Sequence, residues 1–91
     1  MKNIIDSIKE IETDRNVVRF SKLLKICEKY FGDYRVNGSH HVFKTPWQGD
    51  PRINLQKGKD KNAKPYQVLQ VLNALRKLKE FDEAKKNEQN D

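Results

Sequence analysis

The chain has 91 residues, with 19 Lys and Arg against 13 Asp and Glu, so its formal net charge is +6. A chain of this length forms one small domain, and the positive charge favours polyanions as partners. No apolar run approaches the roughly 20 residues that span a bilayer, so a membrane is a poor candidate partner. The single cysteine, Cys27, excludes an internal disulfide and suits the reducing cytoplasm.

Residues 1–16 are an amphipathic N-terminal extension. Its isoleucines recur at helical spacing and predict one apolar stripe on a short helix. They are Ile4, Ile5, Ile8 and Ile11. The stripe suits docking on the domain or on a partner, and a free, fraying arm fits the sequence equally well.

Residues 20–31 predict the first long helix, with Ser21 as its N-cap and Gly32 as its C-terminal stop. Its apolar face carries Phe20, Leu23, Leu24, Cys27, Tyr30 and Phe31. Because Cys27 lies within this stripe and has no basic partner nearby in the sequence, we expect a small buried hydrophobe and not a nucleophile.

Three strands are expected next. Strand formers flank Asn37-Gly38, a dipeptide typical of the two central positions of a hairpin turn. Pro46 ends the second strand, and residues 52–56 alternate strictly, with Ile53 and Leu55 inward. This pattern predicts a three-stranded antiparallel sheet.

The last helix is expected to begin at Pro65 and to run to about Phe81, because apolar residues recur there at helical spacing. Residues 82–91 lack that period and predict a disordered polar tail. The fold class is therefore α+β, in the order α-β-β-β-α after an extra short N-terminal helical segment. Two helices would pack on one face of the sheet.

Both histidines of the chain, His40 and His41, fall just after the predicted turn. Imidazole, with an unperturbed pKa of about 6.5, takes up and releases protons near neutrality. Neighbours in a strand point to opposite faces, so only one of the two can meet a substrate. If Phe43 points into the core, His41 shares its side and His40 faces outward with Val42 and Lys44. A histidine pair in a strand is also often ordinary surface or core.

Three stretches of the sequence carry a family resemblance. They are Gly38-Ser39-His40-His41-Val42-Phe43, Lys44-Thr45-Pro46-Trp47-Gln48-Gly49-Asp50-Pro51-Arg52 and Lys64-Pro65-Tyr66-Gln67-Val68. Together they resemble the HicA family of toxins from bacterial toxin–antitoxin pairs, over about residues 17–79. The resemblance implies a double-stranded-RNA-binding-like toxin domain at residues 17–81, cleavage of mRNA, and neutralisation by a HicB antitoxin. It also implies one essential histidine, which points to His40 and keeps His41 as the alternate.

The chemistry of RNA cleavage fits these residue types. RNA carries its own nucleophile, the 2′-hydroxyl, so an enzyme must move two protons and stabilise the charged phosphate. We expect His40 to act as general acid or base, without a metal ion or other cofactor, because no carboxylate cluster indicates a metal site. The second acid–base residue stays open among His41, Lys44 and Arg35.

Basic and aromatic residues are the candidates for RNA contacts. They are Arg35, Lys44, Trp47, Lys57, Lys59, Lys61 and Lys64. The lysines at 57–64 precede a helix start, which favours anions, although a solvated charged loop is the alternative. Trp47 could stack on an unpaired base or cap the core. Together with the family resemblance, which implies cleavage of mRNA, these residues lead us to expect a cytoplasmic endoribonuclease. The alternatives are a non-catalytic RNA-binding module of the same fold and a basic protein-interaction domain.

Overall fold

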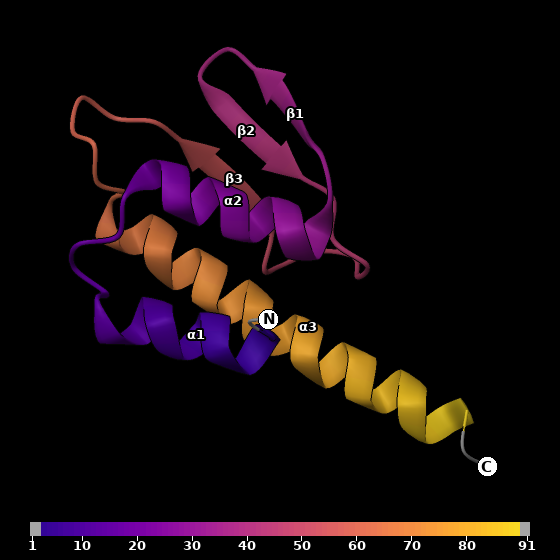
Figure 1. Ribbon diagram of the computed structural model, residues 1–91. Coiled ribbons are helices and arrows are strands. Elements are labelled where there is room, and N and C mark those ends of the chain that lie inside the picture. The colour runs from indigo at the N-terminus through magenta and orange to yellow at the C-terminus, as the bar shows by residue number, and fades with distance from the viewer. Residues whose placement is uncertain (1–2, 90–91) are drawn as a thin grey trace.

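The computed structural model describes residues 3–89, which form three helices and one three-stranded sheet (Figure 1). In chain order the elements are α1 (Ile4–Thr13), α2 (Phe20–Phe31), β1 (Tyr34–Asn37), β2 (His40–Phe43), β3 (Ile53–Gln56) and α3 (Pro65–Gln89). The predicted α+β class and α-β-β-β-α order are confirmed. Over residues 3–89, no helix has the length and apolar character that crossing a membrane requires.

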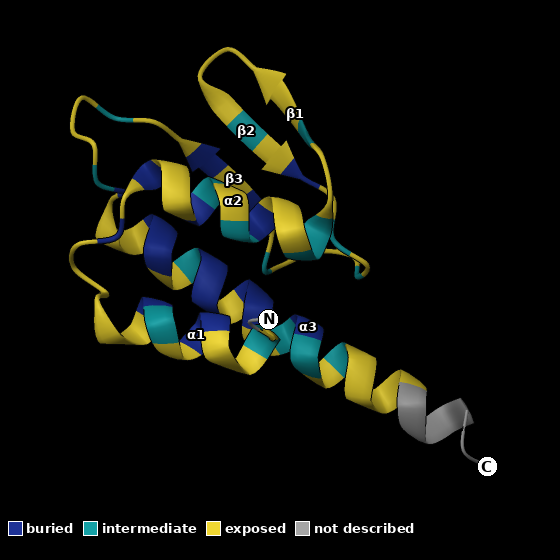
Figure 2. Ribbon diagram, viewed as in Figure 1, coloured by how far each residue is buried: buried dark blue, intermediate teal, exposed yellow. Residues whose placement is uncertain are grey.

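The sheet is antiparallel in the order β1-β2-β3. Its inner face carries Phe43, Ile53 and Leu55, which are buried against the helices, as the dark blue segments of Figure 2 show. The residues that alternate with them face outward and are all exposed. These outward residues are Arg35, Asn37, His40, Val42, Asn54 and Gln56. One face of the sheet is therefore core and the other is open.

The hairpin turn differs from the prediction by one residue. Asn37 pairs with His40, so the two central residues are Gly38 and Ser39. Gly38, the first central residue of the turn, has a positive φ of 63°, whereas Ser39, the second, does not have a positive φ. This is the requirement of a type II′ turn, which needs glycine only at that position.

The start of α2 also differs from the prediction, because Arg19 and not Ser21 holds the N-cap position. The N–H of Phe20 donates to the carbonyl oxygen of Lys61 at 2.9 Å, so a backbone group from a distant loop satisfies this end of the helix. Phe20 is itself buried, which draws the first turn of α2 into the core. Gly32 ends the helix as predicted, with a φ of 85°.

Helix α1 docks on the rest of the chain. Ile8 and Ile11 are buried, and the hydroxyls of Ser7 and Tyr30 lie 2.8 Å apart, which joins α1 to α2. Glu12 forms an ion pair with Arg76 of α3 at 3.0 Å. The sequence left two possibilities for the N-terminal extension, docking or a free arm, and the structure shows that α1 docks on the domain.

Helix α3 is longer than predicted. Its contact with the core reaches Phe81, but the helix continues to Gln89 and extends past the other elements (Figure 1). The prediction of disorder from residue 82 is wrong for residues 82–89, and residues 90–91 lie outside the described residues. The hydrophobic period ends where α3 stops packing against the core. The helix continues beyond that point because residues of high helix propensity follow and because Lys79 and Glu83 form an ion pair (3.1 Å).

Two substitutions within α1 test whether the docking stabilises the domain. Replacing Ile11, which has 1% of its surface exposed, by alanine should lower the free energy of unfolding by about 2–4 kcal/mol. Ile5, which has 43% of its surface exposed, is the matched control, and its replacement by alanine should lower the free energy of unfolding by less than about 1 kcal/mol. Urea denaturation measures both. Equal and negligible effects of Ile11→Ala and Ile5→Ala would show that α1 is a free arm.

Candidate active site

The burial of Phe43 decides which histidine faces outward. Phe43 is 4% exposed. Its ring contacts the ring of Tyr34 on β1, and its backbone pairs with Ile53 on β3. His41 shares its side of β2, and His40 is exposed on the open face with Val42. The expected facing of β2, with Phe43 and His41 inward and His40 outward, is confirmed.

His40 is oriented by a side chain from the neighbouring strand. Its Nδ1 lies 3.0 Å from Oδ1 of Asn54. An amide oxygen can only accept, so Nδ1 carries the proton and Nε2 has the lone pair in the neutral ring. Asn54 is itself well fixed, because it lies between the fully buried Ile53 and Leu55 and its backbone N–H donates to Gln70 Oε1 at 3.3 Å.

His41 is a packing residue. Its ring makes edge contacts with Phe20 (5.5 Å between centroids) and Tyr34 (4.9 Å). Its Nδ1 donates to the carbonyl oxygen of Leu55 at 3.2 Å. Since His41 and His40 lie on opposite faces, they cannot act together on one phosphate.

The residues immediately around His40 are amides. Its partners across the sheet are Asn37 and Gln56, and Gln56 donates to the Ser39 hydroxyl at 2.9 Å. Arg35 lies on the same face, one diagonal step away on β1, where neighbours are roughly 7–8 Å apart. Lys44 is four residues along the strand direction, about 13 Å away. Arg35 is thus the nearer cation to His40.

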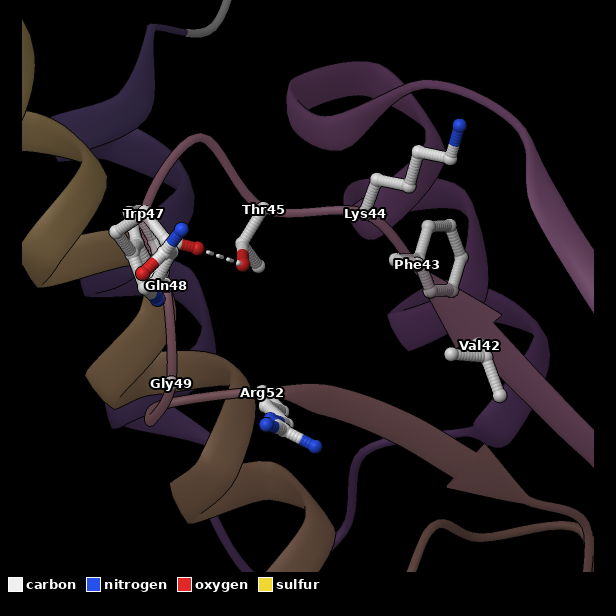
Figure 3. A pocket seen from close by; sticks show the side chains of 8 residues that line it. All are labelled: Val42, Phe43, Lys44, Thr45, Trp47, Gln48, Gly49 and Arg52. Atoms are coloured by element: carbon white, nitrogen blue, oxygen red, sulfur yellow. Dashed lines mark hydrogen bonds between the residues drawn. The ribbon is translucent and has the colours of Figure 1, made fainter.

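A hollow opens at the other end of the sheet, where the chain leaves β2 and returns into β3. It has a volume of about 770 Å³ and opens broadly to solvent. Figure 3 shows Lys44 and Arg52 at the edge of this hollow, with their side chains directed away from each other, and Trp47 with Gln48 at one end.

Trp47 caps the core and anchors this loop. Its ring contacts Phe31 and Phe81 at centroid distances of 6.0 and 6.3 Å, and Lys77 Nζ lies 5.2 Å from its centre. Its Nε1 donates to the carbonyl oxygen of Pro51 at 2.9 Å. Of the two roles considered for Trp47, the capping role is the one these contacts describe.

The lysines at 57, 59, 61 and 64 are all exposed. Their loop is tied to the start of α2 and not only to α3, since Ala63 N–H donates to the Val18 carbonyl at 2.7 Å. Lys57, Lys61 and Arg19 line a small hollow there. The loop is therefore a fixed basic surface near the end of the sheet that bears His40.

Cys27 is fully buried, as the sequence predicts. Burial raises the pKa of its thiol to about 12, and the charge of Glu28 adds to the increase. Cys27 is therefore a thiol at neutral pH. Among the side chains that the structure describes, no group of three or more His, Cys, Asp or Glu is arranged to hold a metal ion.

A scan of protein-family models found no match, and searches of curated proteins and of solved structures found none that reached significance.

Two residues of this surface were not singled out from the sequence, namely Asn54 and Arg52. The alternation of residues 52–56 already predicts that both point away from the core. What it does not give is the pairing register, His40 opposite Gln56 and Phe43 opposite Ile53, which brings Asn54 beside His40. Arg52 lines the same hollow as Lys44. That register depends on how the intervening loop folds.

The two histidines should differ in their effect on stability. His40→Ala removes an exposed side chain, so its unfolding midpoint should stay within a few degrees of the parent. His41→Ala removes two ring contacts and a hydrogen bond and should cost about 1–2 kcal/mol. Thermal unfolding followed by circular dichroism compares them. A larger loss for His40→Ala than for His41→Ala would contradict the assigned faces.

Proposed function

We propose that the protein is an endoribonuclease that cleaves mRNA, with His40 as the general acid–base group. The observation that carries this proposal is the pairing of His40 with Asn54 on the open face of the sheet, with Nδ1 and Oδ1 3.0 Å apart. This contact favours the tautomer with the proton on Nδ1, which leaves Nε2 as the proton acceptor that deprotonation of a hydroxyl requires. The exposed position lets a large substrate reach it.

The proposed step is an internal transfer within the RNA. His40 Nε2 takes the proton of the 2′-hydroxyl, and the 2′-oxygen forms a bond to the adjacent phosphorus. The bond from phosphorus to the 5′-oxygen breaks, and that oxygen takes a proton from solvent. The products are a 2′,3′-cyclic phosphate and a 5′-hydroxyl. A positioned acid–base group contributes typically about 10²–10⁴-fold to such a step.

The cations of the open face support a phosphate substrate. Arg35 lies one diagonal step from His40 and can stabilise the negative charge that develops on the phosphorane. A guanidinium does not release its proton at neutral pH, so Arg35 serves in this proposal as an electrostatic group and not as an acid. The lysine loop at residues 57–64 would contact the backbone further away.

The resemblance to HicA toxins points in the same direction. It supports a toxin of a toxin–antitoxin pair that acts in the cytoplasm, silenced by a HicB-type antitoxin. We propose that the antitoxin covers the face bearing His40, because blocking substrate access is the simplest way to silence an enzyme that has no cofactor to withhold. Complementary charge would make this association fast and salt-dependent.

A non-catalytic RNA-binding module of the same fold is the second candidate. It is favoured by the amide character of Asn37, Asn54 and Gln56 around His40, because amides neither give nor take protons at neutral pH. In that case His40 would contact a phosphate or a base without chemistry. The cleavage experiment below separates the two candidates.

Replacing His40 should abolish cleavage. Purified His40→Ala protein, incubated with a labelled RNA and a chelator, should cut at least about 100-fold more slowly than the parent because the proton acceptor is missing. Gel analysis of the products over time measures both rates.

His41→Ala is the matched control and should keep most of the activity when assayed below its unfolding midpoint. Parent protein that binds RNA but never cuts it would favour the binding module. His40→Ala protein that cuts at the parent rate would exclude His40 as the acid–base group.

Asn54 should act as a positioning residue through its contact with His40. In Asn54→Asp a carboxylate faces Nδ1–H and favours the imidazolium form, so the acidic limb of kcat/KM against pH should move upward by about one unit. The base must be neutral to act, hence activity falls at pH 6 and is recovered at higher pH. Asn54→Ala should instead lower the rate across the profile. Identical profiles for Asn54→Asp and Asn54→Ala would contradict this role.

A further inference from the structure

The two outer strands of the sheet differ in how their free edges are covered. The edge of β3 is hydrogen-bonded by two glutamines of α3. Gln67, which is 1% exposed, donates from Nε2 to the carbonyl oxygen of Gln56 at 2.9 Å. Gln70 Oε1 accepts the backbone N–H of Asn54 at 3.3 Å. The edge of β3 is therefore closed to another strand.

The edge of β1, the outer strand of the hairpin in Figure 1, has no such cover. The two-residue turn makes Asn37 and His40 a hydrogen-bonded pair, and such pairs alternate with non-hydrogen-bonded pairs along an antiparallel ladder. The backbone N–H and C=O groups of Tyr34 and Val36 therefore point away from β2. Among the groups that the structure describes, none outside the hairpin forms a hydrogen bond with them.

A cation lies between these two positions. Arg35 is exposed on the open face, and no Asp or Glu oxygen of the described residues lies within 4.0 Å of its guanidinium. A second copy of the chain, paired antiparallel so that all the free groups of Tyr34 and Val36 are used, would place the two Arg35 side chains opposite each other. Like charges in opposition are destabilising, and each copy has a net charge of +6. The edge is therefore unsuited to self-pairing.

An acidic strand fits the same position. A glutamate or aspartate opposite Arg35 forms a favourable cross-strand pair. Arg35 and Lys44 also line a hollow of about 310 Å³, where Asp33 is the one acidic lining residue. The neighbours of that carboxylate in the added strand would point to the other face, beside the half-buried Tyr34 and beside Val36, which is 58% exposed. Apolar side chains suit those positions.

We propose that the free edge of β1 binds an extended segment of a partner protein as a fourth strand, and that acidic and apolar residues alternate in this segment. The backbone groups of Tyr34 and Val36 complete the ladder, and Arg35 selects the charge. RNA lacks the alternating N–H and C=O groups that this edge pairs with. The inference goes beyond the proposed function, because it uses neither His40 nor cleavage.

The first test follows the hydrogen exchange of individual amides by NMR. The probe is a short synthetic peptide in which glutamate alternates with valine, added to the full chain. The amides of Tyr34 and Val36 should then exchange at least about tenfold more slowly, because strand pairing protects them. The amides of Arg35 and Asn37 already pair with β2 and should change less.

Two control peptides separate strand pairing from general attraction. The valines of the bound segment are the residues that hydrogen-bond to β1, so N-methylation of the valines should abolish the protection at unchanged charge. A peptide with lysine in place of glutamate should give none, because its cations would lie opposite Arg35.

Two variants locate the binding at the edge. Val36→Pro removes one N–H from the free edge and keeps the pairing with β2, so the affinity for the glutamate peptide should fall by about tenfold or more. Val36→Thr keeps that N–H, is the matched control and should bind nearly as well as the parent. Arg35→Glu should reverse the preference towards the lysine peptide. It keeps every backbone group, so it decides the question even if circular dichroism shows that Val36→Pro is unfolded.

The remaining outcomes would overturn the inference. Slower exchange at Tyr34 and Val36 on raising the protein concentration alone would assign the edge to a second copy. Slower exchange with an oligouridylate but not with the glutamate peptide would assign it to RNA. Unchanged exchange with the glutamate peptide, or equal protection by the glutamate and lysine peptides, would show that the edge does not select an acidic strand.

Discussion

The alternation of buried and exposed residues along three short strands is the constraint on which the rest of the structure depends. Phe43, Ile53 and Leu55 are almost completely buried, and each can point inward only if its neighbours point outward. A shift of one residue in the pairing would bury His40 and expose Phe43. The same hydrophobic packing that holds the sheet on the helices therefore also presents His40 and Asn54 together on the open face.

The open face divides into two parts with different chemistry. At the turn end, one imidazole lies among neutral amides, with Arg35 one diagonal step away on the same face. At the other end, Lys44 and Arg52 line one hollow beside a loop that Trp47 fixes to the core. The buried Cys27 and the packed His41 belong to the core and take no part in this surface.

Local patterns predicted most of the fold, because each one depends on a few neighbouring residues. Period-two alternation identified β3, helical periods identified α2 and most of α3, and Gly32 marked a helix end. The predictions failed where contacts between distant parts of the chain, or weak local preferences, determine the structure. A carbonyl from Lys61 replaced the expected Ser21 cap, Gly38-Ser39 formed the turn, and α3 continued past its packed part. For the site, His40 followed from its strand face, whereas Asn54 and Arg52 depend on pairing across a loop.

The central claim is that His40 activates the 2′-hydroxyl of RNA, and the chemical nature of the product ends tests it most directly. The parent protein would be incubated with an end-labelled RNA in the presence of a chelator, and the fragments analysed by mass spectrometry. The proposed chemistry requires 2′,3′-cyclic phosphate and 5′-hydroxyl ends, and no cut when the nucleotide at the cleavage site is 2′-deoxy. Fragments with 5′-phosphate ends, or cleavage of the 2′-deoxy substrate, would contradict it.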